Sequence, residues 1–134
     1  MTDLLRVQDL KVAFGDTEVV HGISFGIVPG ETLAVVGESG SGKSVTALSI
    51  LRLIEREGGR IAGGRILYHP DNDTVDITAL DEAALTSLRG SAISMVFQEP
   101  MTSLNPVLTI GDQVSEVFIR HRGMRLSQAL TAAE

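Results

Sequence analysis

Eight consecutive residues carry the strongest chemical signal in the sequence: Gly37-Glu38-Ser39-Gly40-Ser41-Gly42-Lys43-Ser44. They match the Walker A pattern G-x-x-x-x-G-K-[ST] at every fixed position. Glycines let the backbone curl so that successive N–H groups point inward, and a following helix adds the positive end of its dipole. Such a loop binds a chain of phosphate groups, and we call residues 37–44 the phosphate loop. Lys43 is expected to reach the β- and γ-phosphates, and the Ser44 hydroxyl is expected to bind Mg²⁺.

A strand before this loop and a helix after it must hold the loop in place. The short apolar run from Thr32 to Val36 predicts a strand that is buried on both faces. A helix is predicted from Lys43 to Glu55, because apolar residues recur on one of its faces. The residues of that face are Val45, Leu48, Leu51 and Ile54.

Two antiparallel strands are predicted before this unit, from Leu5 to Phe14 and from Ile23 to Val28. Apolar and polar residues partly alternate in both stretches, and Gly15-Asp16 marks a turn between them. After the helix, glycines at positions 58, 59, 63 and 64 predict an interruption of regular secondary structure, called the glycine break below. A short strand from Arg65 to Tyr68 is expected to follow.

The middle of the chain predicts one more helix and one more strand. Asp81 is suited to cap a helix that runs through Leu88 and is closed by Gly90. The apolar stretch from Ile93 to Phe97 then predicts a second buried strand.

A loop that begins at Gln98 and contains two prolines leads into the C-terminal part of the chain. Thr109 is expected to cap a helix from Ile110 to about Arg120. Leu126-Ser127-Gln128 is interpreted as the start of a further helix.

The composition excludes several classes of protein. The chain has 134 residues, 43% apolar and 21% charged, which is typical of a globular domain. A net charge of −6 and only 4% aromatic residues disfavour binding to nucleic acid. The absence of cysteine excludes disulfides, thiolate zinc sites and a cysteine nucleophile, and it fits a reducing compartment. No signal peptide or membrane span is evident, so any association with a membrane is expected to go through a partner.

Two segments point to a known family. The first is Gly30-Glu31-Thr32-Leu33 and the loop and helix start that follow, positions 37 to 48. The second, positions 95 to 106, reads Met-Val-Phe-Gln-Glu-Pro-Met-Thr-Ser-Leu-Asn-Pro. With these segments, the whole chain resembles the N-terminal part of an ABC-transporter nucleotide-binding domain. It is most similar to the ATP-binding subunits of dipeptide, oligopeptide and glutathione importers, and the second segment resembles the Q-loop of that group.

The resemblance implies an α/β fold of the P-loop NTPase class, with a RecA-like core and an N-terminal antiparallel β-subdomain. It divides the chain into an antiparallel β-subdomain (about 1–31), the phosphate-loop unit (32–56), a variable β/α segment (57–92), the strand and Q-loop (93–109), and the start of the helical subdomain (110–134). The Walker B motif, the Leu-Ser-Gly-Gly-Gln signature and the switch histidine are not found. The chain is therefore expected to hold somewhat over half of such a domain, truncated at the start of the helical subdomain.

The resemblance also assigns roles to two residues outside the phosphate loop. The family's Q-loop glutamine contacts Mg²⁺ and the region of the attacking water, which implies that role for Gln98; without the family, Gln98 is a polar loop residue. Phe14 lies where the family places an aromatic residue that stacks on adenine, and a core position in the strand is the alternative. The implied nucleotide-binding residues are Phe14, Gly37, Glu38, Ser39, Gly40, Ser41, Gly42, Lys43, Ser44 and Val45. Lys43 and Gln98 are the catalytic candidates, and Ser44 and Gln98 the Mg²⁺ ligands.

The implied function is an ATPase subunit that uses ATP and Mg²⁺ to drive import of short peptides or a related solute. Its expected partners are transmembrane permease subunits, contacted through the loop 98–106, and a second ATP-binding subunit or domain in a head-to-tail dimer. A solute-binding protein would act indirectly. The expected location is the cytoplasmic face of the inner membrane, peripheral through the permease subunits.

Two other functions stay open on the sequence. A catalytically inactive fragment would bind only nucleotide or a partner, and these 134 residues alone are expected to be inactive because Walker B and the signature are missing. Another P-loop enzyme, such as a GTPase, would usually carry Asn-Lys-x-Asp; the two lysines, Lys11 and Lys43, do not fit that motif.

The family's sheet also implies that these residues are unstable in isolation. Strands from later in the family's chain lie between the strand at Thr32 to Val36 and the strand at Ile93 to Phe97. Without them both strands would expose unpaired backbone and apolar side chains. The 134 residues alone are therefore expected to aggregate, unfold in part or oligomerise.

Overall fold

The computed structural model describes residues 3–71, 73–97 and 104–133. They belong to two compact units, of which the first ends at Leu85 and the second begins at Thr86.

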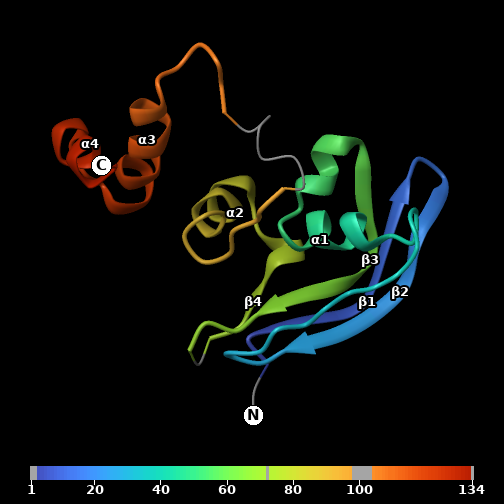
Figure 1. Ribbon diagram of the computed structural model, residues 1–134. Coiled ribbons are helices and arrows are strands. Elements are labelled where there is room, and N and C mark those ends of the chain that lie inside the picture. The colour runs from blue at the N-terminus through green and yellow to red at the C-terminus, as the bar shows by residue number, and fades with distance from the viewer. Residues whose placement is uncertain (1–2, 72, 98–103, 134) are drawn as a thin grey trace. The chain divides into compact units, whose positions relative to one another are not determined.

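A four-stranded antiparallel sheet forms the frame of the first unit (Figure 1). Its strands are β1 (Leu5–Phe14), β2 (Thr17–Ile27), β3 (Gly59–Tyr68) and β4 (Val75–Asp76), in the order β2-β1-β3-β4. The predicted antiparallel pair is confirmed, and β1 has the predicted bounds. β2 begins at Thr17, directly after the Gly15-Asp16 turn and well ahead of the predicted start at Ile23.

A bulge around Asp9 decides which side chains of β1 are buried. The register with β2 shifts between Val7 and Leu10, and Asp9 has a positive φ of 46°. Because of this extra residue, Val7, Leu10 and Val12 all lie in the core. On the neighbouring strand, Gly64 has a φ of +85°, and a Cβ there would lie 2.3 Å from the Asp9 carbonyl oxygen. Gly64 therefore accommodates the bulge within β3.

The predicted glycine break before Arg65 is consequently wrong for positions 59, 63 and 64, which all lie inside β3. Only Gly58, with a φ of +80°, ends an element, the short 3-10 helix η1 (Leu53–Glu57).

Helix α1 (Lys43–Ile50) lies over one face of this sheet (Figure 1). It ends earlier than the predicted Glu55, because Arg52 takes a left-handed conformation with a φ of 52°. The apolar face that the sequence predicted is buried only at Leu51 and Ile54, both beyond the end of α1. Within α1 itself the buried side chains are Thr46 and Ser49.

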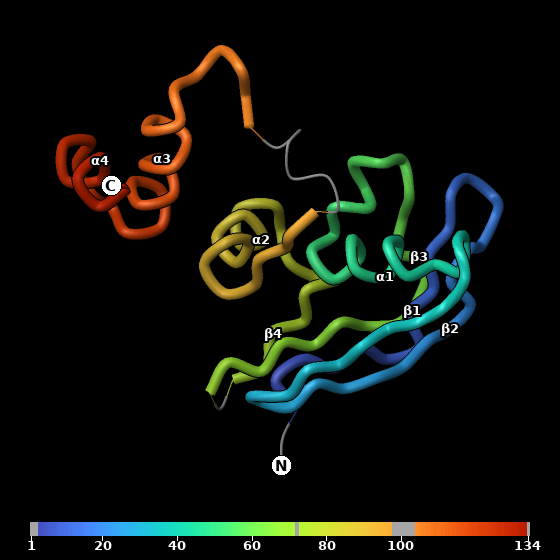
Figure 2. The backbone as a smooth tube through the Cα atoms, in the orientation of Figure 1, coloured from blue at the N-terminus to red at the C-terminus, as the bar shows by residue number. Residues whose placement is uncertain are grey.

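The segment between β2 and α1 corrects another prediction. After a turn at Gly30, the chain runs back past β2 to α1 without forming a strand (Figure 2). Thr32 to Val36 is therefore not a buried strand, and the Val35 and Val36 side chains are 55% and 89% exposed. A strand buried on both faces needs hydrogen-bonded neighbours. Within 3–71, 73–97 and 104–133 no strand pairs with this segment.

Helix α2 (Glu82–Leu88) forms where it was predicted. The Asp81 carboxylate accepts a hydrogen bond from the Ala84 N–H at 2.8 Å, which is an N-cap interaction. Gly90 follows the helix with a φ of +83°. Before α2, the 3-10 helix η2 (Ile77–Ala79) buries Ile77 in the first unit.

The second predicted strand, Ile93 to Phe97, is also wrong. Ile93 makes a single isolated bridge with Arg89, and Val96 and Phe97 are 92% and 51% exposed. The physical reason is the same, because the described residues provide no strand beside it.

The second unit contains α3 (Ile110–Arg122) and α4 (Leu126–Ala133), which pack on each other. Thr109 caps α3 by accepting a hydrogen bond from the Asp112 N–H at 3.1 Å, as predicted. Helix α4 starts at Leu126, where the sequence indicated a helix. No helix in the described part of the chain has the length and apolar character needed to cross a membrane.

Candidate functional site

The glycine-rich segment before α1 folds into a tight loop. Gly40 and Gly42 have φ values of +82° and +89°, which disfavour other residues. The Ser41 N–H donates to the Glu38 carbonyl oxygen at 3.2 Å and closes the turn. A Cβ on Gly37 would lie 2.6 Å from the Ser41 hydroxyl, whereas a Cβ on Gly40 would meet nothing within 4 Å.

Lys43, the first residue of α1, turns its ammonium group back onto this loop. Its Nζ donates to the carbonyl oxygens of Gly37 at 2.8 Å and Glu38 at 2.6 Å, and to the Ser41 hydroxyl at 3.3 Å. The three donors of the ammonium group are thus directed at the loop. The arrangement places a positive charge beside the N-terminus of a helix, where the backbone N–H groups already favour an anion.

The start of α1 is fixed at Gly42. Gly42 is the N-cap, and its carbonyl oxygen accepts from both the backbone N–H and the side-chain hydroxyl of Thr46, each at 2.8 Å. On its other side, a Cβ on Gly42 would lie 3.3 Å from a methyl group of Val20. The loop is therefore packed against strand β2 as well as bonded to its own helix.

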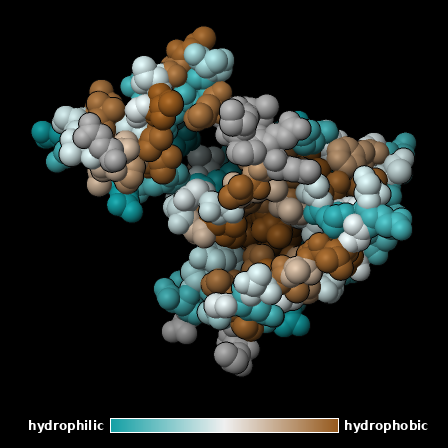
Figure 3. All heavy atoms as spheres, viewed as in Figure 1, coloured by the Kyte–Doolittle hydropathy of each residue, from teal (hydrophilic) through white to brown (hydrophobic). Residues whose placement is uncertain are grey.

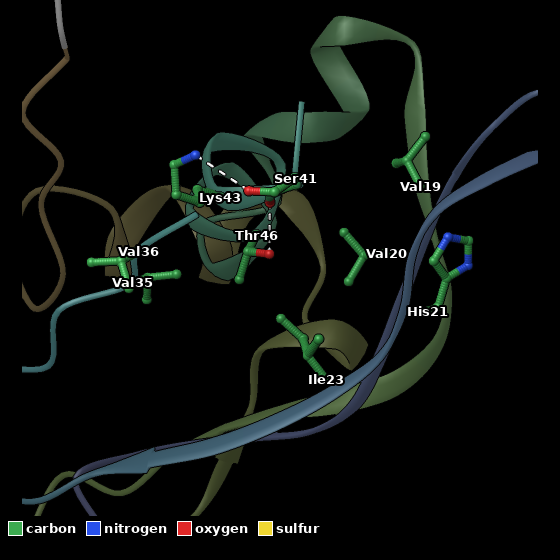
Figure 4. Close-up of a pocket in the computed structure, with 10 residues that line it drawn as sticks. Val19, Val20, His21, Ile23, Val35, Val36, Ser41, Lys43 and Thr46 are labelled. Carbon is green, nitrogen blue, oxygen red and sulfur yellow. Dashed lines mark hydrogen bonds between the residues drawn. The ribbon is translucent and has the colours of Figure 1, made fainter. Parts of the chain in front are cut away.

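An open pocket of about 300 Å³ lies between β2 and the phosphate loop (Figure 4). Its apolar wall comes from β2 and from the chain before the loop, and its polar side comes from the loop and α1. Brown, apolar atoms reach the surface beside α1 in the space-filling view (Figure 3). The lining residues are Val19, Val20, His21, Ile23, Val35, Val36, Ser41, Gly42, Lys43 and Thr46.

The structure brings together the predicted residues 37–45, which are contiguous in the chain. Ser44 is exposed in the first turn of α1, and Val45 is half-buried beside it. Gln98 lies outside the described residues, as does most of the loop 98–106 that is predicted to contact the permease subunits. At the described end of that loop, Leu104 is 49% exposed. The roles assigned to residues 37–45 and to Gln98 all stay predictions.

Phe14 lies at the end of β1, opposite Gly59 of β3. A Cβ on Gly59 would come within 3.1 Å of the Phe14 ring and 2.7 Å of Ile54. The ring is half-buried against this strand, and it does not line the pocket beside Lys43. Both interpretations of Phe14 therefore stay open.

Val19, Val20 and Thr46 contribute to the site but were not predicted from the sequence. Val19 and Val20 reach the loop only because β2 starts early and pairs with β1, which is a non-local relationship. For Thr46, the sequence did contain a pattern from which its contact with the loop could have been predicted. It lies four residues after the last glycine of the loop, the spacing at which a threonine hydroxyl can bond to a helix carbonyl.

The geometry fits a nucleotide polyphosphate and its Mg²⁺ ion. The glycine positions leave open backbone at Gly40, the loop precedes a helix N-terminus, and Lys43 supplies a cation. Ser44 supplies an exposed hydroxyl oxygen, the hard type of ligand that Mg²⁺ prefers.

The segment 37–45 lies within the match to a known family model. The family model described as "ABC transporter" matches residues 20–134, which is most of the chain. The chain therefore belongs to the ABC transporter family. This membership confirms the α/β P-loop NTPase class that the sequence predicted.

The similar proteins are named as transport or import ATP-binding proteins. The chain is 47% identical, over 96% of its length, to the oligopeptide transport ATP-binding protein AppD of Bacillus subtilis, covering 39% of that protein. It is 43% identical, over 98% of its length, to the glutathione import ATP-binding protein GsiA of Salmonella typhimurium, covering 22% of it. A Brucella melitensis protein, named provisionally as a peptide import ATP-binding protein, is 55% identical, with 97% of this chain and 40% of the relative covered. The chain thus spans well under half the length of these relatives.

Proposed function

We propose that this chain is the phosphate-binding part of an ATP-binding subunit that drives the import of short peptides or a related solute. The observation that carries the proposal is the contact of the Lys43 ammonium with Gly37 and Glu38 in a glycine loop at a helix N-terminus. That arrangement concentrates donors and positive charge at one point of a chain whose net charge is −6.

Lys43 would exchange its loop acceptors for phosphate oxygens, which are stronger, charged acceptors. The loop N–H groups would hold the same phosphates, and the open backbone at Gly40 leaves room for their approach. These contacts bind and orient the polyphosphate, and positioning with charge stabilisation is the main contribution that a protein makes to phosphoryl transfer.

Mg²⁺ would be held by the Ser44 hydroxyl and, on the family resemblance, by Gln98. When bound, the ion neutralises charge on the phosphates. The neutral amide of Gln98 suits this role because its carbonyl oxygen can face a metal while its N–H₂ orients a water or phosphate oxygen. Phe14 is the proposed adenine contact.

The names of the relatives support the transport function, since AppD is named as an oligopeptide transport ATP-binding protein and GsiA as a glutathione import ATP-binding protein. On this basis we propose permease subunits, contacted through 98–106, a second ATP-binding subunit and, indirectly, a solute-binding protein as partners. The place of action would be the cytoplasmic face of the membrane. Residues 1–134 alone would not sustain ATP hydrolysis. If these residues alone released phosphate from ATP, and Lys43→Ala abolished that release, the proposed inactivity would be contradicted.

The test of the proposal uses the protein at full length, reconstituted in vesicles with its permease subunits. Uptake of a labelled short peptide is measured against MgATP and free Mg²⁺. Ser44→Ala should shift the Mg²⁺ requirement to higher concentration. Ser127→Ala, an exposed serine at the equivalent second position of α4, is the matched control. Uptake without ATP, or an unchanged Mg²⁺ requirement in Ser44→Ala, would contradict the proposal.

A further inference from the structure

Thr46 holds the phosphate loop without belonging to it. Its side chain is 6% exposed, and its Oγ1 and its backbone N–H both donate to the Gly42 carbonyl oxygen at 2.8 Å. Figure 4 shows the hydroxyl bond, with Thr46 below the loop and Val20 on the β2 side of the pocket. Gly42 is thus held by two donors from α1 while Val20 packs against its other side.

This contact has a consequence for Lys43, because Gly42 and Lys43 share one peptide unit. The peptide unit is planar and trans, so its C=O and N–H point in opposite directions. The two donors of Thr46 fix the Gly42 C=O toward the helix. The Lys43 N–H must then point out of the helix N-terminus, the direction from which an anion approaches.

We propose that Thr46 is a positioning residue for nucleotide binding, which acts through the Gly42–Lys43 peptide unit and not by touching the ligand. The inference rests on the proposed function, since it assumes that the loop binds a nucleotide. The hydroxyl holds the peptide plane in a conformation that includes the left-handed φ of +89° at Gly42. Without it, one backbone donor alone holds the carbonyl.

Another residue of α1 provides a control for the effect that a buried hydroxyl has on helix stability alone. Ser49, one turn further along α1, is also fully buried and donates its hydroxyl to the Val45 carbonyl oxygen at 2.7 Å. Its acceptor is inside the helix, so its loss should affect stability without changing the direction of the loop N–H groups.

The experiment measures the Kd of MgATP by calorimetric titration of the full-length protein and its Thr46→Val, Thr46→Ser and Ser49→Ala variants. Thr46→Val should weaken binding about two- to tenfold, the range that the loss of one hydrogen bond produces. Thr46→Ser should restore the wild-type affinity, and Ser49→Ala should retain it. If Thr46→Val does not fold, Thr46→Ala makes the same comparison with the residue most favourable to a helix.

Equal affinity in wild type and Thr46→Val would overturn the inference, as would a Thr46→Ser variant as weak as Thr46→Val. Equal losses in Thr46→Val and Ser49→Ala would also overturn it, because they would show a general effect of α1 stability. All three results leave the proposed function standing. Failure of the wild-type protein to bind MgATP would instead remove the proposed function, and the inference with it.

Discussion

The guanidinium of Arg52 donates from Nη1 to the Leu80 carbonyl oxygen at 2.6 Å, across 28 positions of the sequence. The same group bonds to the Glu55 carboxylate at 2.8 and 3.2 Å, and this hydrogen bonding raises the pKa of Arg52. The Arg52 side chain is only 18% exposed. Arg52 therefore joins the end of α1 to the segment that leads into α2.

Arg52→Ala should destabilise the first unit, because it leaves the Leu80 carbonyl without this charged donor. The expected loss is about 1–2 kcal/mol in the free energy of unfolding. Arg56→Ala is the control, since Arg56 is 69% exposed and pairs with Glu82 at 3.6 Å, and it should cost under about 0.5 kcal/mol. Urea unfolding of the full-length protein measures both. Equal urea midpoints for the two variants would show that the Arg52 contact does not stabilise the first unit.

Phe14→Leu separates the two interpretations of Phe14. Leucine keeps an apolar contact with Gly59 but removes the ring face, so an adenine-stacking role predicts weaker ATP binding by about three- to tenfold. Inorganic tripolyphosphate, which has no base, should bind as tightly as it does to the wild type. If ATP affinity does not change, Phe14 is a strand-core residue and not an adenine contact.

Gln113 ties the chain before α3 to that helix. Its side-chain oxygen accepts from the Asn105 N–H at 2.7 Å, and its Nε2 donates to the carbonyl oxygens of Asn105 and Leu108 at 3.0 and 3.1 Å. Gln113→Ala should therefore speed amide hydrogen exchange at Asn105 by severalfold, because that N–H loses its acceptor. Gln128→Ala on α4 is the control. Unchanged exchange at Asn105 would mean that Gln113 does not hold this segment.

Residues 1–134 expressed alone should associate at micromolar concentration. The apolar segments around Val36 and Val96 are exposed, and no strand among the described residues pairs with them; such segments favour contact between chains. Replacing both valines by serine should reduce association in size-exclusion chromatography. A monomeric elution volume of the unsubstituted chain, with a cooperative thermal transition, would refute this expectation.

The features that the sequence predicted correctly are those set by neighbours in the chain. The phosphate loop is contiguous, and the caps at Asp81 and Thr109 each depend on an N–H three residues later. The predicted strands at Thr32 to Val36 and at Ile93 to Phe97 do not form, because an apolar run becomes a strand only when other strands pair with it. The bulge at Asp9 and the glycine opposite it at position 64 could not be found for a similar reason, since each depends on cross-strand pairing.

The buried face of α1 shows how polar residues can mislead a pattern-based prediction. Apolar periodicity indicated Val45 and Leu48, yet Thr46 and Ser49 are the residues buried in that helix. Their hydroxyls bond to carbonyl oxygens of the preceding turn, so they can be buried without an unsatisfied polar group. A hydrophobicity pattern does not record this local compensation.

Binding of the ATP phosphates by Lys43 is tested by a titration of MgATP into the full-length protein. The chain has one other lysine, Lys11 on β1, so Lys11→Ala is a control that removes the same charge elsewhere. Lys43→Ala should weaken binding by at least about tenfold, since a hydrogen bond to a charged group contributes about 1.5–3 kcal/mol. Lys11→Ala should bind like the wild type. Equal affinity of Lys43→Ala and Lys11→Ala for MgATP would show that Lys43 does not bind the phosphates.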